Sequence, residues 1–344
     1  MEATLDTLGM FDAAAALPEQ VAAAAVAAAG VAGLPAHDDV ENVVVIGMGG
    51  SGMAGDVLPV IAGPFMSVPV VVHKAYGLPN FIGEGSLVIA VSFSGNTEET
   101  VEAAAEAVAT GARLVVVTVG GRLGALADES GAPWVPIDAT IPMPRAGIGA
   151  VSIPPLVILE QIGLFPGASA WIDAAVTQLR RRRDQLVADR NPAEQLARHL
   201  GRLMPIIYGG GGLGGVAALR WKAQFNENAK VPAFSNALPE LCHNEICGWG
   251  QNGDVTRQVF AVVNLRHEFE HPQIARRFEL INALIDEVVA DIHEVVAEGE
   301  GALAQLLDLV MFGDFVTLHR AAQEGIDPGP VPVLEELKHA LAQD

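Results

Sequence analysis

The chain has 344 residues, of which 51% are hydrophobic and 5% aromatic, and its formal net charge is −21. This length is enough for two domains of ordinary size, and the apolar content is enough to fill their cores. The acidic balance argues against a nucleic-acid-binding protein, because phosphate backbones require clustered lysine and arginine.

No membrane span is expected, since no apolar run reaches about 18 residues without a Gly, Pro or charged residue. The N-terminus lacks the basic start of a signal peptide. The only two cysteines, Cys242 and Cys247, do not make a disulfide framework. The one basic run, Arg180–Arg183, is interpreted as a solvated helix face. These features lead us to expect a cytoplasmic protein without a nucleic-acid or membrane partner.

Along the chain, the alanine-rich N-terminal stretch is predicted to be helical, with a break or start at Pro18. Two later segments share one plan. NVVVIGMGGSGMAGDVL (residues 42–58) and MPIIYGGGGLGGVAALRW (residues 204–221) each read as an apolar strand, a glycine-rich turn and a helix. A short apolar run bounded by glycines is typical of a buried parallel strand.

Further strands are predicted at residues 68–74, 86–93, 112–119, 231–235 and 258–265, with helical patterns such as TEETVEAAAEAVATGA between them. This alternation predicts an α/β protein with two tandem, doubly wound parallel sheets. The predicted divisions are an N-terminal helical segment (1–37), a first domain (38–152), a helical linker (153–192), a second domain (193–325) and a tail helix (326–344).

Two sets of glycines fit the pattern G-x-G-x-x-G behind a strand: Gly47, Gly49 and Gly52, and Gly209, Gly211 and Gly214. Dinucleotide binding would require an acidic residue about 20 positions further on. His73 and Lys74 stand there instead, and these basic side chains would suit a phosphorylated ribose. The alternatives are tight packing of strand against helix, or a cradle for a smaller phosphate at the helix start.

The stretch SFSGNTEET favours the phosphate cradle. It places Ser92, Ser94 and Thr97 directly before a predicted helix. One such residue would be enough to cap a helix. Three hydroxyls around a glycine exceed that need, and together with free N–H groups they indicate a phosphate clamp.

These residues resemble a known family. GMGGSGMAGD and SFSGNTEET are similar to the signature loops of sugar isomerase (SIS) domains. Two such modules, with WKAQFNENAKVPAF and PELCHNEICGW in the second, resemble the bifunctional phosphoglucose/phosphomannose isomerases of archaea and some bacteria. The resemblance runs from about Val43 to the C-terminal helix. It implies three-layer αβα sandwiches and interconversion of glucose 6-phosphate, and mannose 6-phosphate, with fructose 6-phosphate, without a metal or cofactor.

The resemblance also implies roles for individual residues. The positions that match the family are Gly50, Ser51, Ser92, Ser94 and Thr97 for the phosphate, Glu227 as catalytic base, Arg145 for stabilising the enediolate, and His243 with Lys338 for opening the ring. In the family the histidine enters from the other subunit, so a homodimer is implied. Arg145 offers a planar fork that could face two oxygens of an enediolate.

Two departures from the family pattern bear on specificity. The tail GPVPVLEELK lacks the threonine that often precedes the lysine and is linked to accepting the mannose epimer. Phe93 stands where the family loop often has tyrosine.

A non-catalytic phosphosugar sensor is the alternative function.

Each site residue also has an ordinary interpretation. Glu227 fits a solvated helix residue, Arg145 a surface ion pair, His243 a structural histidine and Lys338 an exposed tail lysine. Cys242 and Cys247 are interpreted as small apolar fillers around His243, because a structural zinc site would need four ligands.

Overall fold

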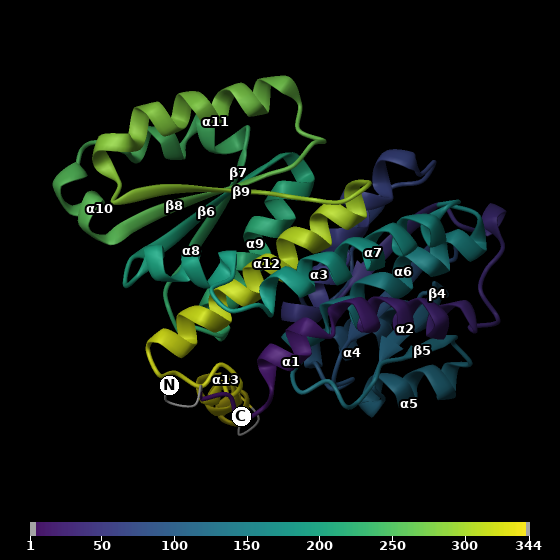
Figure 1. The fold of residues 1–344 in the computed structure, drawn as a ribbon. Coiled ribbons are helices and arrows are strands. Elements are labelled where there is room, and N and C mark those ends of the chain that lie inside the picture. Colours follow the sequence, from purple (N-terminus) through teal and green to yellow (C-terminus); the bar gives the residue numbers. More distant parts are fainter. Residues whose placement is uncertain (1–4, 342–344) are drawn as a thin grey trace.

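The computed structural model describes residues 5–341 (Figure 1). The strands are β1 (Asn42–Ile46), β2 (Val70–His73), β3 (Ser86–Ser92), β4 (Arg113–Thr118), β5 (Trp134–Pro136), β6 (Met204–Gly210), β7 (Phe234–Leu238), β8 (Phe260–Arg266) and β9 (Asp291–Val296). The helices of the first half are α1 (Met10–Ala15), α2 (Leu17–Ala29), α3 (Gly49–Ile61), α4 (Glu98–Ala109), α5 (Gly121–Ser130), α6 (Ile148–Ile162) and α7 (Ala168–Leu186). Those of the second half are α8 (Pro192–Leu200), α9 (Gly211–Glu227), α10 (Gly253–Val259), α11 (Pro272–Ile285), α12 (Ala302–Gln323) and α13 (Pro332–Leu341). Short 3-10 helices are η1 (His37–Asp39), η2 (Gly63–Phe65), η3 (Pro144–Gly147), η4 (Glu240–His243), η5 (Glu245–Gly248) and η6 (Asp286–Val288).

The strands form two parallel sheets, in the orders β2-β1-β3-β4-β5 and β7-β6-β8-β9. In the first sheet, α4 and α5 cover one face and α3 and α6 the other. In the second sheet, α11 covers one face and α9 and α12 the other. Each domain is therefore a three-layer αβα sandwich, which confirms the predicted fold class.

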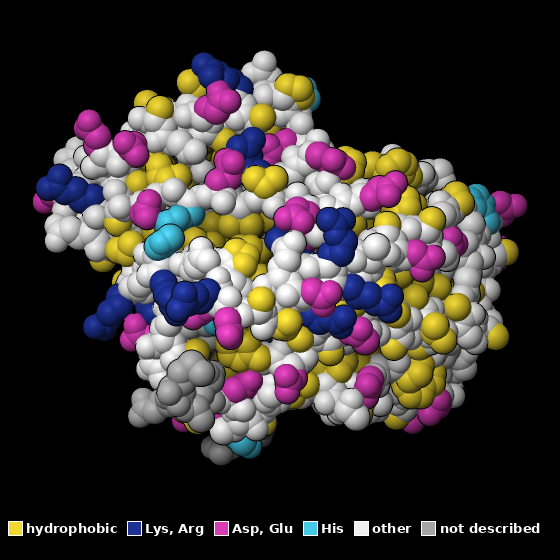
Figure 2. All heavy atoms as spheres, in the orientation of Figure 1, with side chains coloured by type: hydrophobic (Ala, Val, Ile, Leu, Met, Phe, Trp, Pro, Cys, Tyr) yellow, Lys and Arg dark blue, Asp and Glu magenta, His cyan; other side chains and the backbone are white. Residues whose placement is uncertain are grey.

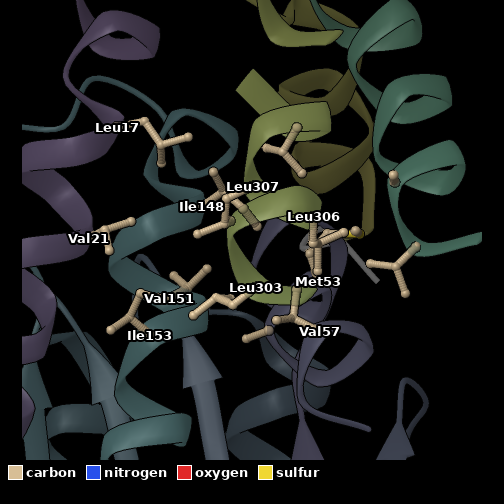
Figure 3. Close-up of a cluster of buried hydrophobic side chains, with 14 of the residues drawn as sticks. Leu17, Val21, Met53, Val57, Ile148, Val151, Ile153, Leu303, Leu306 and Leu307 are labelled. Carbon is tan, nitrogen blue, oxygen red and sulfur yellow. The ribbon is translucent and has the colours of Figure 1, made fainter. Parts of the chain in front are cut away.

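The inner helical layers of the two domains form one continuous core. Figure 3 shows side chains of α2, α3, α6 and α12 meeting, including Leu17, Met53, Val151 and Leu306. The helices of the predicted linker belong to this core: α6 begins at Ile148 and continues through Pro154 and Pro155. α3 contacts α9, and α7 contacts α12, so buried apolar surface holds the two sheets in a fixed relation.

α12 is the only helix within residues 5–341 that is long and apolar enough to cross a membrane. Its most apolar stretch is 89% buried inside the protein. The interruptions by Asp308 and Asp314 face buried arginines on α7 and α9 rather than solvent. These features identify α12 as a core helix.

The basic run on α7 differs from its interpretation as a solvated face. Arg182 is buried, and its guanidinium donates to both carboxylate oxygens of Asp308, at 2.7 Å each. Arg183 pairs with Glu19 of α2. A helix turns every third or fourth residue toward the core, so one member of four consecutive arginines is carried inside. On the face drawn in Figure 2, Lys and Arg side chains lie beside Asp and Glu side chains and form no continuous basic surface.

Candidate active site

Two helices, α3 and α4, begin side by side at the carboxyl end of the first sheet. β1 and β3 are parallel neighbours, so their carboxyl ends and the starts of α3 and α4 lie together. Within residues 5–341, neither N-cap residue, Met48 or Thr97, caps its helix through its side chain. The first-turn N–H groups of both helices are therefore left for water or a ligand.

Two of the predicted hydroxyls build the loops at these helix starts. The Ser51 hydroxyl accepts from the N–H of Phe93 at 2.9 Å, which ties the β1–α3 loop to the β3–α4 loop. The buried Ser92 hydroxyl accepts from the N–H of Gly95 at 3.1 Å. Both side chains fix the shape of the two loops, and both can still donate their own protons.

Ser94 and Thr97 lie closer to solvent. The Ser94 hydroxyl accepts from the N–H of Asn96 at 3.2 Å, and the Ser94 side chain is exposed. The Thr97 hydroxyl lies 3.0 Å from that of Ser92 rather than on its own helix. The helix-cap interpretation therefore does not hold for Thr97.

The second glycine-rich loop, between β6 and α9, is filled by the protein itself. A Cβ atom on Gly210 would lie 3.0 Å from a carboxylate oxygen of Glu270, and one on Gly212 would lie 2.9 Å from Val60 of α3. A Cβ on Gly209 would overlap the backbone of Gly214. This loop follows the packing interpretation, because a carboxylate and an apolar side chain occupy the space that an anion would need.

Arg145 and Glu227 meet at the junction of the two domains. Nη1 of Arg145, on η3, lies 3.7 Å from Oε2 of Glu227, the last residue of α9. The arginine side chain is 2% exposed and the glutamate side chain 30%. Burial lowers the pKa of Arg145, and the carboxylate of Glu227 opposes this shift. Arg145 is thus not in a solvated surface ion pair.

The β1–α3 loop, which Ser51 ties to the β3–α4 loop, lies directly beside the backbone of Arg145. A Cβ atom on Gly50 would come within 3.3 Å of the Cα of Arg145. The structure therefore brings together the loops of Ser51 and Ser92, the arginine and the glutamate. It combines anion-binding groups, a carboxylate and a fixed positive charge, which are the parts required for proton transfer through an anionic intermediate.

The guanidinium of Arg145 is not free to use its whole fork. Its Nε donates to Oδ1 of Asn228 at 2.8 Å, and its Nη2 donates to the backbone oxygens of Pro328 and Gly329. Of the three guanidinium nitrogens, only Nη1 has no hydrogen-bond acceptor within residues 5–341. One nitrogen of the fork, the buried Nη1 next to Glu227, is therefore left without a hydrogen-bond acceptor among the described residues.

The backbone of η3 is held by a second buried arginine. Arg220 of α9 donates through Nη2 to the carbonyl oxygen of Arg145 at 2.7 Å. Arg220 also pairs with both carboxylate oxygens of Asp314 on α12, at 3.1 and 2.8 Å. Burial raises the pKa of Asp314, and the arginine opposes that shift.

Replacing Asp314 with Ala is expected to lower the free energy of unfolding by about 3–5 kcal/mol, because Arg220 would keep its charge in the core without a partner. Urea denaturation of both proteins measures the difference. Glu279→Ala is the control, because it removes the partner of Arg276 in an exposed ion pair and should cost less than about 1 kcal/mol. Equal losses for the two variants would contradict the importance of the buried pair.

His243 projects from a well-anchored loop. It ends η4 and is exposed, and within residues 5–341 its ring makes no hydrogen bond or ion pair. The loop is held by Glu245, whose carboxylate accepts from the Tyr208 hydroxyl and from Nδ2 of Asn236. Burial and this carboxylate raise the pKa of Tyr208. Glu245 therefore positions the loop, and the structure does not join His243 to Arg145 or Glu227 within one chain.

Lys338 and the cysteines lie outside the cluster. Lys338 is exposed on α13, a helix with no buried residue. Cys242 is partly buried and packs against the outer core of the second domain, as expected of an apolar filler. Cys247 is exposed, so that interpretation is wrong for it.

Sequence reasoning missed the residues that surround Arg145: Asn228, Arg220, Asp314, Pro328 and Gly329. Asn228 directly follows Glu227 in the stretch NENAK, and this proximity was the only local signal. The remaining contacts join segments that are far apart in sequence.

Comparisons with known proteins agree with this architecture. The family "Bacterial phospho-glucose isomerase C-terminal SIS domain" matches residues 189–341, and the SIS domain family matches residues 38–130. The chain is 35% identical over 338 residues to the bifunctional phosphoglucose/phosphomannose isomerase of Caldicellulosiruptor bescii, covering 97% of this chain and 99% of that protein. It is 33% identical to the protein of the same name from Thermoplasma acidophilum, over 88% and 90% of the two chains. A crystal structure of a hypothetical protein from Thermus thermophilus shares the fold with a TM-score of 0.72 at 18% identity, over 97% and 90% of the chains.

Proposed function

The chain belongs to the bifunctional phosphoglucose/phosphomannose isomerases, and from this premise we propose that it interconverts glucose 6-phosphate and mannose 6-phosphate with fructose 6-phosphate. This aldose–ketose isomerisation moves a proton between C1 and C2 of the sugar through a cis-enediolate. The observation that carries the assignment is the placement of the Arg145–Glu227 pair beside the hydroxyl-rich loops of the first domain.

The phosphate group is assigned to the starts of α3 and α4, where N–H groups and the hydroxyls of Ser51, Ser94 and Thr97 lie together. Backbone N–H groups and the positive end of the helix dipole favour an anion at such a place. Ser92 stabilises the β3–α4 loop by accepting a hydrogen bond from the N–H of Gly95. An anchored phosphate would hold C1 and C2 at a fixed distance from Glu227.

Glu227 is assigned as the base that carries the proton between C1 and C2. Its partly exposed carboxylate can reach a substrate, while its neighbour Arg145 is buried. Nη1 of Arg145 would donate to the enediolate oxygen as negative charge develops, in a setting where few protein groups need to reorganise. The chemistry assigned to these side chains requires no metal or cofactor.

Ring opening is assigned to His243 and Lys338 of a homodimer, with His243 entering the active site of the partner. The support is that His243 is exposed on an anchored loop. α13, which carries Lys338, also exposes Val333, Leu337 and Leu341, with 65%, 57% and 64% of their surfaces accessible. A second subunit would cover this apolar face and complete the site.

The net charge of −21 has to be reconciled with a nearly dianionic substrate. At physiological salt the Debye length is about 8 Å, so distant carboxylates are mostly screened. Arg145 and the two helix starts then dominate the local potential. A cytoplasmic location is part of the proposal, and the two free cysteines are consistent with a reducing compartment.

A coupled assay on each aldose phosphate, with and without a chelator, tests the proposed activity. Turnover of both substrates is expected, with equal rates in chelator. Because the tail lacks the family threonine, kcat/KM should be lower for mannose 6-phosphate. If neither glucose 6-phosphate nor mannose 6-phosphate is converted, the proposed activity is refuted. Loss of turnover in chelator would refute the metal-free assignment.

A further inference from the structure

Asn228 links the proposed base to the proposed cation. It follows Glu227 at the end of α9, and it is 1% exposed. Its Oδ1 accepts from Nε of Arg145 at 2.8 Å. Its Nδ2 donates to the hydroxyl of Thr317 on α12 at 3.0 Å. Both ends of the amide are therefore used, one toward the active site and one toward the core.

Thr317 completes a chain of hydrogen bonds that fixes the amide. Its hydroxyl donates to the backbone oxygen of Asp314 at 2.8 Å, one turn earlier on α12. The hydroxyl proton is thus committed, and the oxygen is left to accept from Asn228. This sets the amide orientation, because only the oxygen of Asn228 can then face the Nε donor of Arg145.

The hydrogen bond that Asn228 accepts from Arg145 determines where Nη1, the guanidinium nitrogen without an acceptor in the described part of the chain, points. Nη2 is held by the backbone oxygens of Pro328 and Gly329, and Nε is held by Asn228. A planar guanidinium held at two corners has its third corner fixed. That corner is Nη1, which lies 3.7 Å from the carboxylate of Glu227. Without Asn228, the guanidinium could swing about the backbone contacts, and Nε would lose its acceptor.

We propose that Asn228 is a positioning residue for isomerisation: it aligns Nη1 of Arg145 with the carboxylate of Glu227 through a hydrogen-bonded chain that begins on α12. This role rests on the proposed function above. Asn228 touches no reacting atom and acts through Arg145. Because a misplacement of about 1 Å at the reacting groups can lower a rate about 100-fold, the alignment affects turnover more than substrate binding.

The test compares purified Asn228→Ala, Thr317→Val and Thr317→Ser enzymes with the wild type. Asn228→Ala should lower kcat about 100-fold while KM for fructose 6-phosphate stays within about threefold, because the phosphate loops belong to the first domain. Thr317→Val should lower kcat about threefold to tenfold, the effect of one lost hydrogen bond. Thr317→Ser keeps the hydroxyl and should retain nearly all of the activity.

Asn264→Ala is the matched control. Asn264 is fully buried in β8, and its Nδ2 donates to Oδ1 of Asn282 at 2.8 Å, outside the active site. Its loss should lower the melting temperature without changing the kcat of the folded enzyme. If Asn228→Ala behaves in the same way, the positioning role is refuted. If Asn228→Ala does not fold, a Thr317→Val enzyme with wild-type kcat refutes it instead. A wild-type enzyme without turnover would refute the proposed function first, and this role with it.

Discussion

Glu227→Gln is expected to lower kcat for fructose 6-phosphate by about 1,000-fold, within the range that general acid–base catalysis contributes. The amide has the shape of the carboxylate but cannot accept the substrate proton. Substrate affinity should change less than about tenfold, because the phosphate is assigned to the loops at the starts of α3 and α4 and not to Glu227. Nη1 of Arg145 would keep its place, since Asn228 and the backbone of residues 328–329 hold the guanidinium.

Two measurements separate catalysis from binding in this variant. Exchange of the C2 deuteron of labelled glucose 6-phosphate with water reports proton transfer, and calorimetry with fructose 6-phosphate reports affinity. Glu102→Gln, on the exposed face of α4, is the control and should leave both unchanged. Full activity in Glu227→Gln would show that the base lies elsewhere. Tight binding of fructose 6-phosphate by a wild type that exchanges no deuteron would favour the phosphosugar sensor.

The sequence predicted the central strands well because each is buried on both sides. β1, β3, β4, β6 and β8 are continuous apolar runs, which is the pattern of a parallel strand covered by helices. β9 was missed because it is an edge strand of mixed polarity, DIHEVV, with only one buried residue. β5 was missed because it has three residues. β7 begins three residues later than predicted, at Phe234.

The candidate site was only half predictable for a similar reason. The hydroxyl loops are contiguous stretches at strand ends, and adjacent parallel strands bring them together. The surroundings of Arg145 depend on how α12 packs against α9, which no local pattern specifies. The same holds for the segment of Pro328 and Gly329, which lies more than 180 residues from Arg145. The family resemblance thus implied the candidate groups, but tertiary packing determined the contacts around Arg145.

The second large effect is expected for replacement of His243. His243→Ala is expected to lower kcat about 100-fold, because ring opening would lose its acid/base group. The loop itself should stay in place, since Glu245 anchors it through Tyr208 and Asn236. The control is Cys242→Ser combined with Cys247→Ser, which changes both flanks of the histidine and should leave catalysis largely intact. Equal losses in the two variants would point to the loop rather than to the imidazole.

Mixing two inactive variants tests whether the histidine is shared between subunits. When differently tagged Glu227→Gln and His243→Ala chains are co-expressed, about half of the dimers should be mixed. If His243 serves the partner, each mixed dimer contains one site with both Glu227 and His243 intact and one site with neither. The preparation should then recover about one quarter of wild-type activity. If His243 serves its own subunit, no dimer contains an intact site, and activity stays at the level of the parents. The first outcome restores activity and the second does not. The experiment therefore decides whether the exposed His243 serves its own subunit or its partner.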